Sequence, residues 1–182
     1  MKPYIKLLFS KIKCSYIKLF KCRNFKTIGI QIFSYNARFV FGKKSNVQFG
    51  DRIINDGRVT MIVDNEATLK IGDNVYFNED FMVSVKSSVT IGSGSQFGPN
   101  VKIFDNNHNF NSTDGVLYTH NSAPIVIGEH CWIGTNCVIL RGTHIGNNCI
   151  IAAGCIVKGD IPDGSIVSQS TSLNIRPIED RI

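Results

Sequence analysis

Residues 125–139 read IVIGEHCWIGTNCVI, and the same rhythm continues to residue 161. A branched aliphatic residue returns at every sixth position: Ile127, Ile133, Ile139, Ile145, Ile151 and Val157. Small residues follow most of these four positions later: Cys131, Cys137, Thr143, Cys149 and Cys155. A period of six fits neither an α-helix nor a simple strand alternation. It is typical of a parallel β-helix, in which short strands alternate with turns and aliphatic side chains stack inward from coil to coil.

The repeat can be followed toward the N-terminus. Comparable coil starts are Val47, Leu69, Val89 and Ile125, which are separated by 22, 20 and 36 residues. Three hexapeptides make a coil of 18, so the first two gaps are a coil plus a small bulge. The last gap holds a coil plus the polar, Asn-rich residues 104–123. We therefore predict an all-β protein with a β-helix domain over 46–164, a protruding loop over 104–123 and a tail over 165–182.

The basic charge of the chain is confined to its first part. Residues 1–50 contain eleven Lys and Arg and no acid, whereas residues 51–182 contain nine basic and fourteen acidic residues. This distribution argues against a nucleic-acid groove along the whole chain. We expect residues 1–45 to form a basic, largely helical arm outside the β-helix.

Residues 1–24 have apolar side chains at helical spacing, with lysines on the other faces. The apolar set is Ile5, Leu8, Phe9, Ile12, Tyr16, Leu19 and Phe20. No apolar run is long enough for a signal-peptide core or a transmembrane span. Two interpretations stay open: a helix on an anionic membrane surface, or a helix packed on the body or on a neighbouring subunit. We expect a cytoplasmic protein, with peripheral attachment to the inner membrane surface under the first interpretation.

Four of the six cysteines fall in the repeat phase. Cys131 and Cys137 are six apart, as are Cys149 and Cys155, whereas zinc sites use pairs separated by two to four residues. We predict that these are small, buried packing residues. We expect no metal and a reducing compartment, because nothing suggests a disulfide framework.

The loop 104–123 carries two of the four histidines, His108 and His120, and a long excursion from a regular solenoid is usually functional. The repeats, this loop, the motif Cys131-Trp132-Ile133-Gly134 and the ending Gly159-Asp160-Ile161-Pro162-Asp163-Gly164 together resemble the hexapeptide-repeat acyltransferases. Within that family the similarity is to galactoside and maltose O-acetyltransferases and to relatives that acetylate bacterial surface polysaccharides. The resemblance implies a left-handed parallel β-helix, a homotrimer with sites between subunits, and acetyl-CoA as the donor.

The resemblance also implies roles for individual residues. His108 falls at the position of the family's catalytic histidine, Trp132 at its motif tryptophan, and Asn78 at an asparagine that contacts the acceptor sugar. The coenzyme A groove would be lined by Thr135, Ala153, Lys158, Gly159 and Arg176. The sequence departs from the family pattern at two places: the lysine near the end of the repeat is shifted by one position, and Ser168–Ser172 replace a Gly-x-Pro-Ala motif.

The expected chemistry is acetyl transfer to a sugar hydroxyl, with neutral His108 as general base and a backbone N–H as oxyanion donor. We expect Asn78, Trp132 and Asp105 to bind substrate. Either Asp105 or a backbone carbonyl could orient the imidazole, and His120 could face the substrate or be inert. Three alternatives are weighed against this. An N-acetyltransferase for an amino sugar would depend less on His108. A non-catalytic scaffold at a membrane would not bind acetyl-CoA. A γ-type carbonic anhydrase needs closely spaced zinc-binding histidines, whereas the four here are 12, 10 and 14 residues apart.

Overall fold

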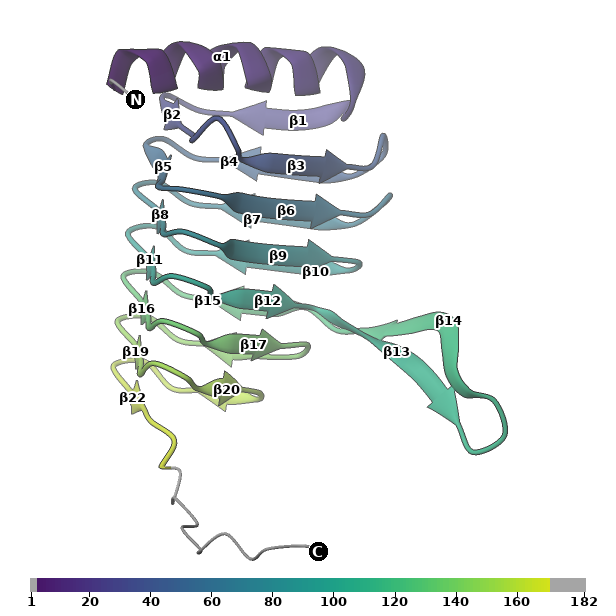
Figure 1. The fold of residues 1–182 in the computed structure, drawn as a ribbon. Helices are drawn as coiled ribbons and strands as arrows, with labels where there is room; N and C mark the ends of the chain where they lie inside the picture. The colour runs from purple at the N-terminus through teal and green to yellow at the C-terminus, as the bar shows by residue number, and fades with distance from the viewer. Residues whose placement is uncertain (1–2, 171–182) are drawn as a thin grey trace, which may run out of the picture.

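The computed structural model describes residues 3–170, in which one helix precedes a solenoid of stacked coils (Figure 1). Each complete coil contributes one strand to each of three parallel sheets, which we name A, B and C. Sheet A contains β1 (Asn24–Thr27), β4 (Asn46–Phe49), β7 (Thr68–Ile71), β10 (Ser88–Ile91), β15 (Ile125–Ile127), β18 (His144–Ile145) and β21 (Asp160–Ile161). Sheet B contains β2 (Gln31–Ile32), β5 (Ile53–Asn55), β8 (Tyr76–Phe77), β11 (Gln96–Phe97), β16 (Trp132–Ile133), β19 (Ile150–Ile151) and β22 (Ile166–Val167). Sheet C contains β3 (Arg38–Phe41), β6 (Val59–Val63), β9 (Phe81–Val85), β12 (Lys102–Phe104), β17 (Val138–Leu140) and β20 (Ile156–Val157).

The strand register confirms the parallel β-helix and its coil spacing. In sheet A, Val47 pairs with Leu69, Leu69 with Val89, and Val89 with Ile125. These are the steps of 22, 20 and 36 residues that the sequence predicts. Shorter coils follow: Val126 pairs with His144, 18 residues later, and His144 pairs with Asp160, 16 residues later.

The solenoid is longer at both ends than its predicted bounds of 46 and 164. Phe25 pairs with Val47 in sheet A, so a complete first coil begins at Asn24, inside the segment expected to be an arm. At the other end β22 pairs with β19, which carries the stack to Val167. The first coil does not follow the hexapeptide pattern. Its inward positions hold large aromatic residues, such as the buried Phe25 and Phe33, where the later coils have aliphatic residues.

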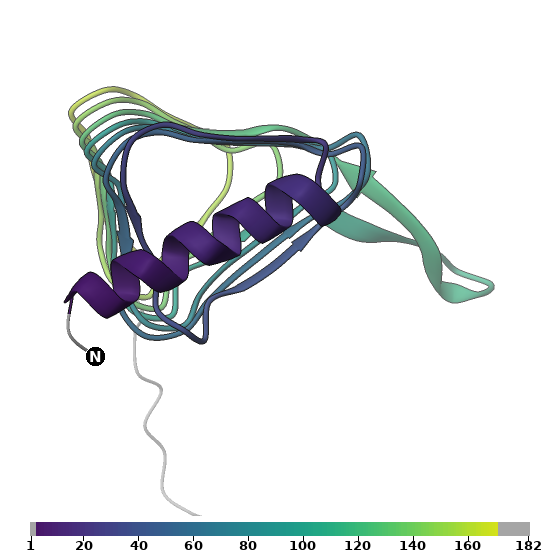
Figure 2. The ribbon, with the colours of Figure 1, turned by 90° about the horizontal axis from the view of Figure 1, so that it is seen from above.

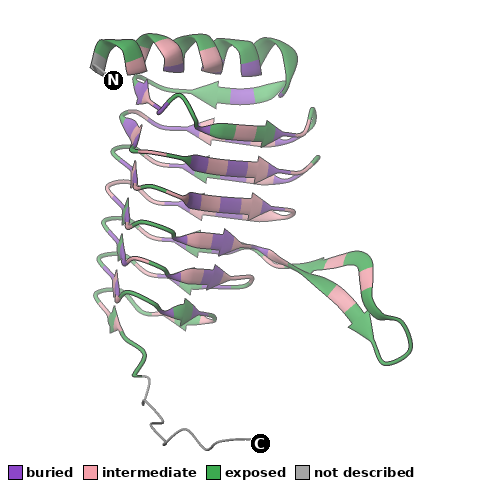
Figure 3. Cartoon of the chain, viewed as in Figure 1, coloured by how far each residue is buried: buried purple, intermediate pink, exposed green. Residues whose placement is uncertain are grey.

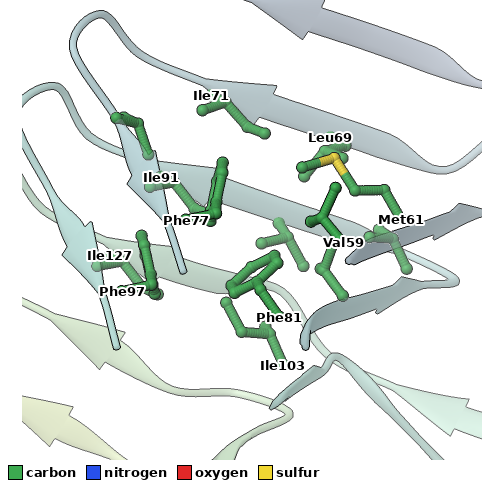
Figure 4. Packing of buried hydrophobic residues seen from close by; sticks show 14 of the residues in the cluster. Val59, Met61, Leu69, Ile71, Phe77, Phe81, Ile91, Phe97, Ile103 and Ile127 are labelled. Carbon is green, nitrogen blue, oxygen red and sulfur yellow. The ribbon is translucent and has the colours of Figure 1, made fainter. Parts of the chain in front are cut away.

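A continuous hydrophobic core fills the interior of the coils (Figure 3). In the coils before residue 104 it is rich in phenylalanine, and Figure 4 shows Phe77, Phe81 and Phe97 packed together. In the later coils it consists mainly of isoleucine and cysteine. The four repeat-phase cysteines are buried free thiols, which confirms their predicted role in packing.

Glycine allows the coils to stack closely at the corner between sheets A and B. Gly128 and Gly146 lie directly above one another, since the N–H of Gly128 donates to the carbonyl of Ile145. A Cβ atom built on Gly128 would lie 2.6 Å from the backbone carbonyl carbon of Gly146. Any larger residue there would push the two coils apart.

Helix α1 (Pro3–Phe20) lies across the N-terminal end of the solenoid (Figures 1 and 2). It is held against the first coil by the buried residues Ser10, Cys14 and Ile17. The Ser10 hydroxyl accepts a hydrogen bond from the N–H of Phe33 at 2.7 Å and donates one to the carbonyl of Lys6 at 2.7 Å. Of the two predicted positions for this helix, packing on the body is therefore observed. No helix in residues 3–170 is long and apolar enough to cross a membrane.

Candidate active site

A two-stranded antiparallel hairpin leaves the solenoid at the corner between sheets C and A (Figure 1). It consists of β13 (Asn106–Asn111) and β14 (Gly115–Ser122), and it confirms the protruding loop expected over 104–123. Most of its side chains are exposed, including the large apolar residues Phe110, Val116 and Tyr118. An exposed apolar hairpin of this kind is suited to contact another surface.

Asp105 anchors the root of the hairpin. Its carboxylate accepts hydrogen bonds from the N–H groups of Lys86 at 2.8 Å and Ser87 at 2.7 Å, and its carbonyl accepts one from Ala123 at 2.9 Å. Asp105 is 0% exposed. The expectation that it contacts substrate or orients His108 is corrected here, because a fully buried carboxylate that already caps two backbone N–H groups reaches neither.

His108 projects from β13 and is exposed. Its Nδ1 lies 3.0 Å from the carbonyl oxygen of Leu117 on β14. A carbonyl can only accept a hydrogen bond, so this contact places the ring proton on Nδ1 and leaves the lone pair of Nε2 free. The orienting group is thus the backbone carbonyl, which was one of the two alternatives from the sequence.

His120 faces His108 across the hairpin. The two residues are paired in the strand register, and their ring centroids are 4.2 Å apart. Desolvation lowers the pKa of His120, and the positive charge of Lys86 and the neighbouring His108 lower it further. These influences favour a neutral His120 beside the candidate base. Sequence spacing alone could not have found this pair, because the contact depends on the register of the hairpin.

The other expected site residues fall into two sets. Asn78, Thr135 and Ala153 follow strands β8, β16 and β19 at the corner between sheets B and C. The N–H of Gly154 donates to the carbonyl of Thr135 at 2.8 Å, so Thr135 and Ala153 lie on adjacent coils. Asn78 is half-buried, and its side-chain oxygen accepts a hydrogen bond from the N–H of Glu79, as a turn residue would.

Trp132 lies on the outer face of sheet B and is 57% exposed. With Gly94, Gln96, His130 and Cys131 it lines a surface pocket of about 390 Å³. A tryptophan that is exposed in a regular strand offers a flat apolar wall to a ligand.

Lys158 and Gly159 follow β20 at the corner between sheets C and A, the corner from which the hairpin emerges. The N–H of His144 donates to the carbonyl of Gly159 at 3.1 Å. Arg176 lies outside the described residues. Strands β8, β16 and β19 lie on one side of the solenoid and the hairpin projects from the other (Figures 1 and 2). One chain therefore does not bring His108 and Trp132 together. Within residues 3–170 no cluster of side chains suited to a metal ion is present.

Comparison with known proteins agrees with this architecture. A family model described as the hexapeptide repeat of succinyl-transferase matches residues 124–158. The putative lipopolysaccharide biosynthesis O-acetyl transferase WbbJ of Escherichia coli is 25% identical over 169 residues, which cover 85% of this chain and 84% of WbbJ. Residues 124–158 thus carry the hexapeptide repeat, and most of the chain is similar to an acetyltransferase.

This hexapeptide-repeat protein is also similar to a second relative and to a solved structure. The galactoside O-acetyltransferase of Escherichia coli is 36% identical over 118 residues, covering 63% of this chain and 57% of that enzyme. The chain thus spans little more than half of that relative. A hexapeptide-repeat containing acetyltransferase from Vibrio cholerae has the same fold, with a TM-score of 0.58 and 21% identity over 94% of this chain and 81% of that one.

Proposed function

We propose that this hexapeptide-repeat protein is an acetyl-CoA-dependent O-acetyltransferase that acts on a sugar hydroxyl of a bacterial surface polysaccharide or its precursor. The observation that carries the proposal is the contact between His108 Nδ1 and the Leu117 carbonyl, which leaves Nε2 as a free base on an exposed hairpin. The names of its relatives support O-acetyl transfer and a glycan acceptor: WbbJ as a putative lipopolysaccharide biosynthesis O-acetyl transferase, and the galactoside O-acetyltransferase. The donor is supported by the hexapeptide-repeat containing acetyltransferase from Vibrio cholerae, of which a complex with acetyl coenzyme A is known.

In the proposed reaction a sugar hydroxyl, which is a poor nucleophile, attacks the activated thioester of acetyl-CoA. Nε2 of His108 takes the proton of the acceptor hydroxyl as its oxygen forms a bond to the thioester carbonyl carbon. The carbonyl oxygen then carries a negative charge, which a backbone N–H stabilises. When the intermediate collapses, the carbon–sulfur bond breaks, the thiol of coenzyme A leaves, and the imidazolium returns its proton to the thiolate. Both substrates meet directly, so no covalent acetyl-enzyme is needed.

His120 supports the base from the second strand of the hairpin. Its ring packs against His108 at 4.2 Å between centroids, and its lowered pKa keeps it uncharged near neutral pH. A charged neighbour would make it harder for His108 to accept a proton. A neutral His120 therefore preserves the basicity of His108 while it restricts movement of the ring.

The substrate-binding surface is proposed to lie on the opposite side of the solenoid. Trp132 provides a flat wall, and the small Ala153 leaves room for an extended pantetheine arm along the coils. Asn78 offers an amide to the acceptor, and Thr135 lies at the same corner between sheets B and C, two coils further along the stack. Lys158 and Gly159 are proposed to meet the coenzyme near the hairpin, with Arg176 contributing a cation for its phosphates.

These two surfaces form one site if the hairpin of one copy meets the Trp132 side of the next. Such a contact joins two different patches of the chain, and a head-to-tail contact of this kind forms a ring where its rotation closes. We propose a homotrimer with an acetyl-transfer site at each subunit boundary. The exposed apolar hairpin residues Phe110, Val116 and Tyr118 provide the contact surface.

The test is acetyl-CoA consumption, followed by thiol release, with sugars and extracted glycans as acceptors. We expect release that requires an acceptor and falls by about 10²–10⁴-fold in His108→Ala. His144→Ala is the matched control, because His144 is also an exposed histidine but belongs to strand β18 of sheet A and not to the hairpin. Acceptor-dependent release that survives His108→Ala would overturn the role of the base, and a failure to bind acetyl-CoA would overturn the proposed donor.

A further inference from the structure

Helix α1 has two apolar faces, and only one of them is used by the fold. The buried face consists of Ser10, Cys14 and Ile17, which contact the first coil. The second face is fully in solvent: Leu8 is 61% exposed, Ile12 62% and Leu19 74%. The same stripe includes the exposed Tyr4, Ile5, Tyr16 and Phe20.

The second face points away from the body. An α-helix turns through about 3.6 residues, so Leu8, Ile12 and Leu19 fall within one narrow sector. Cys14 lies roughly on the opposite side of the helix from that sector, facing the first coil. Figure 3 shows the outer edge of the helix as exposed along its length. Figure 2 shows that α1 lies across the end of the solenoid, with no other element outside it. The exposure of Leu8, Ile12 and Leu19 therefore puts the apolar stripe at the N-terminal end of the molecule.

Positive charge borders the stripe. Lys11 and Lys18 are exposed on one side of it, and Lys21 and Arg23 follow the helix. Lys6 and Lys13 turn toward the body, where they contact Asp56 and the carbonyl of Ala37. No acidic residue occurs in residues 1–50, so the end of the molecule formed by α1 and the first coil carries only positive charged side chains.

We propose that α1 binds the surface of an anionic phospholipid bilayer, lying in the plane of the interface with its outer stripe among the headgroups and acyl boundary. An exposed apolar stripe with lysines at its border is the pattern of interfacial amphipathic helices. Each lysine near an anionic leaflet adds attraction that decays within a Debye length.

The charge pattern favours a lipid surface over a second copy of the chain. If two copies paired through this stripe, Lys11 and Lys18 of each would approach the same cations of the other, with no acid on either helix to offset them. Like charges brought together across an interface oppose association. An anionic bilayer provides an acyl boundary for the apolar stripe and negatively charged headgroups for the lysines beside it.

The experiment uses the full chain and measures co-sedimentation with vesicles of phosphatidylcholine alone or mixed with phosphatidylglycerol. We expect binding to the mixed vesicles, weak binding to phosphatidylcholine, and a decrease as salt is added. The variant Ile12→Gln/Leu19→Gln should lose at least about tenfold in binding, since two apolar contacts with the acyl boundary are removed. Lys11→Gln/Lys18→Gln should reduce binding to the mixed vesicles only.

The matched control is Ile156→Gln, which removes an exposed apolar side chain from β20 at the opposite end of the solenoid from α1 and should leave vesicle binding unchanged. Helix content by circular dichroism verifies that the variants fold. Acetyl transfer to a soluble acceptor should be unchanged in the α1 variants, so loss of vesicle binding is distinguishable from loss of the proposed function. Equal binding by wild type and Ile12→Gln/Leu19→Gln would overturn the proposal. A second outcome would also overturn it: the wild type binds no vesicles, and Ile12→Gln/Leu19→Gln lowers the molar mass measured by light scattering. The stripe would then join copies of the chain.

Discussion

The coils before residue 104 and those after residue 125 share one plan but differ in width. In sheets A and C the early strands span four or five residues, as in β6 and β7, whereas β18 and β20 span two. Sheet B strands stay short throughout, apart from one three-residue strand. The extra residues of the long coils are therefore not a bulge, as the sequence suggested, but longer strands on either side of one corner.

The core follows this change in width. One column of paired inward positions in sheet B holds Phe77 and Phe97 in the early coils and Ile133 and Ile151 in the later ones. Aromatic rings fill the wide coils, while isoleucine and cysteine fill the narrow ones. The corner between sheets C and A absorbs all of the variation, and it is also the corner from which the hairpin leaves. A solenoid can thus vary and add function at one corner while the other two keep the stack in register.

The strongest test of this difference is Phe77→Ala in the wide half. Phe77 is fully buried against Phe81 and Phe97, with ring centroids 4.3 and 5.2 Å away. We expect the free energy of unfolding to fall by about 3–5 kcal/mol, because a large cavity cannot collapse between stacked coils. Denaturant unfolding measures the change. Ile151→Val, at the same column in the narrow half, should cost about 1 kcal/mol, and equal losses for the two variants would contradict the proposed difference.

Asp105→Ala tests the junction between the two halves. The substitution leaves the N–H groups of Lys86 and Ser87 without their acceptor, and we expect a loss of about 3 kcal/mol. Hydrogen exchange in β13 and β14 should also accelerate, since the hairpin loses its anchor. Asn106→Ala serves as the control, because it removes an amide that donates to the same carboxylate and to the carbonyl of Ser84 but leaves the caps on Lys86 and Ser87 in place. Unchanged exchange in Asp105→Ala would show that the hairpin is held by other contacts.

Cys149→Leu tests whether the narrow coils have room to spare. Cys149 is fully buried, and its Sγ lies 3.1 Å from the carbonyl oxygen of Pro162. We expect a loss of about 2 kcal/mol from overpacking. Cys149→Ala removes volume instead and should cost less. The same unfolding experiment measures the change. If Cys149→Leu left the free energy of unfolding unchanged, the narrow core would be more loosely packed than its residues imply.

The smallest effect is expected at the ion pair between helix α1 and the second coil. Asp56 lies 3.0 Å from Lys6, whose hydrogen bond lowers the pKa of the carboxyl, and Tyr76 lowers it further. Because the folded pKa is below the unfolded one, the stabilisation is present above the unfolded pKa and is lost as the pH falls through the folded value. The pair is partly exposed, so Asp56→Asn should cost less than about 1 kcal/mol at neutral pH.

The measurement is the difference in unfolding free energy between wild type and Asp56→Asn across acidic pH. It should shrink toward zero as the wild-type carboxyl takes up its proton. A double-mutant cycle with Lys6→Met isolates the pair from the contribution of Tyr76. A difference that grows on acidification would have the opposite sign and would rule out this origin.

The six-residue phase predicted the narrow coils in detail, because a minimal coil leaves one buried position per strand and little freedom in its size. It predicted the wide coils only by their spacing, and it missed the first coil, where Phe25 and Phe33 replace the stacked aliphatic residues. The break in the repeat placed His108 in a protruding loop, which is the hairpin of the structure, whereas its role as the base rests on the resemblance and stays a prediction. The sequence could not distinguish Asp105 from a backbone carbonyl, since burial of a carboxylate depends on the fold around it.

The position of the hairpin along the stack has a further consequence. It leaves after β12, which is three coils below β3, and neighbouring strands are about 4.8 Å apart, so the hairpin root lies about 15 Å below the first coil. If α1 rests on a bilayer, the number of coils between α1 and the hairpin sets the distance of the His108 imidazole from the lipid. An acceptor would be selected by how far its hydroxyl stands from its membrane anchor, and inserting one coil would increase the distance of the imidazole from the lipid by about 5 Å.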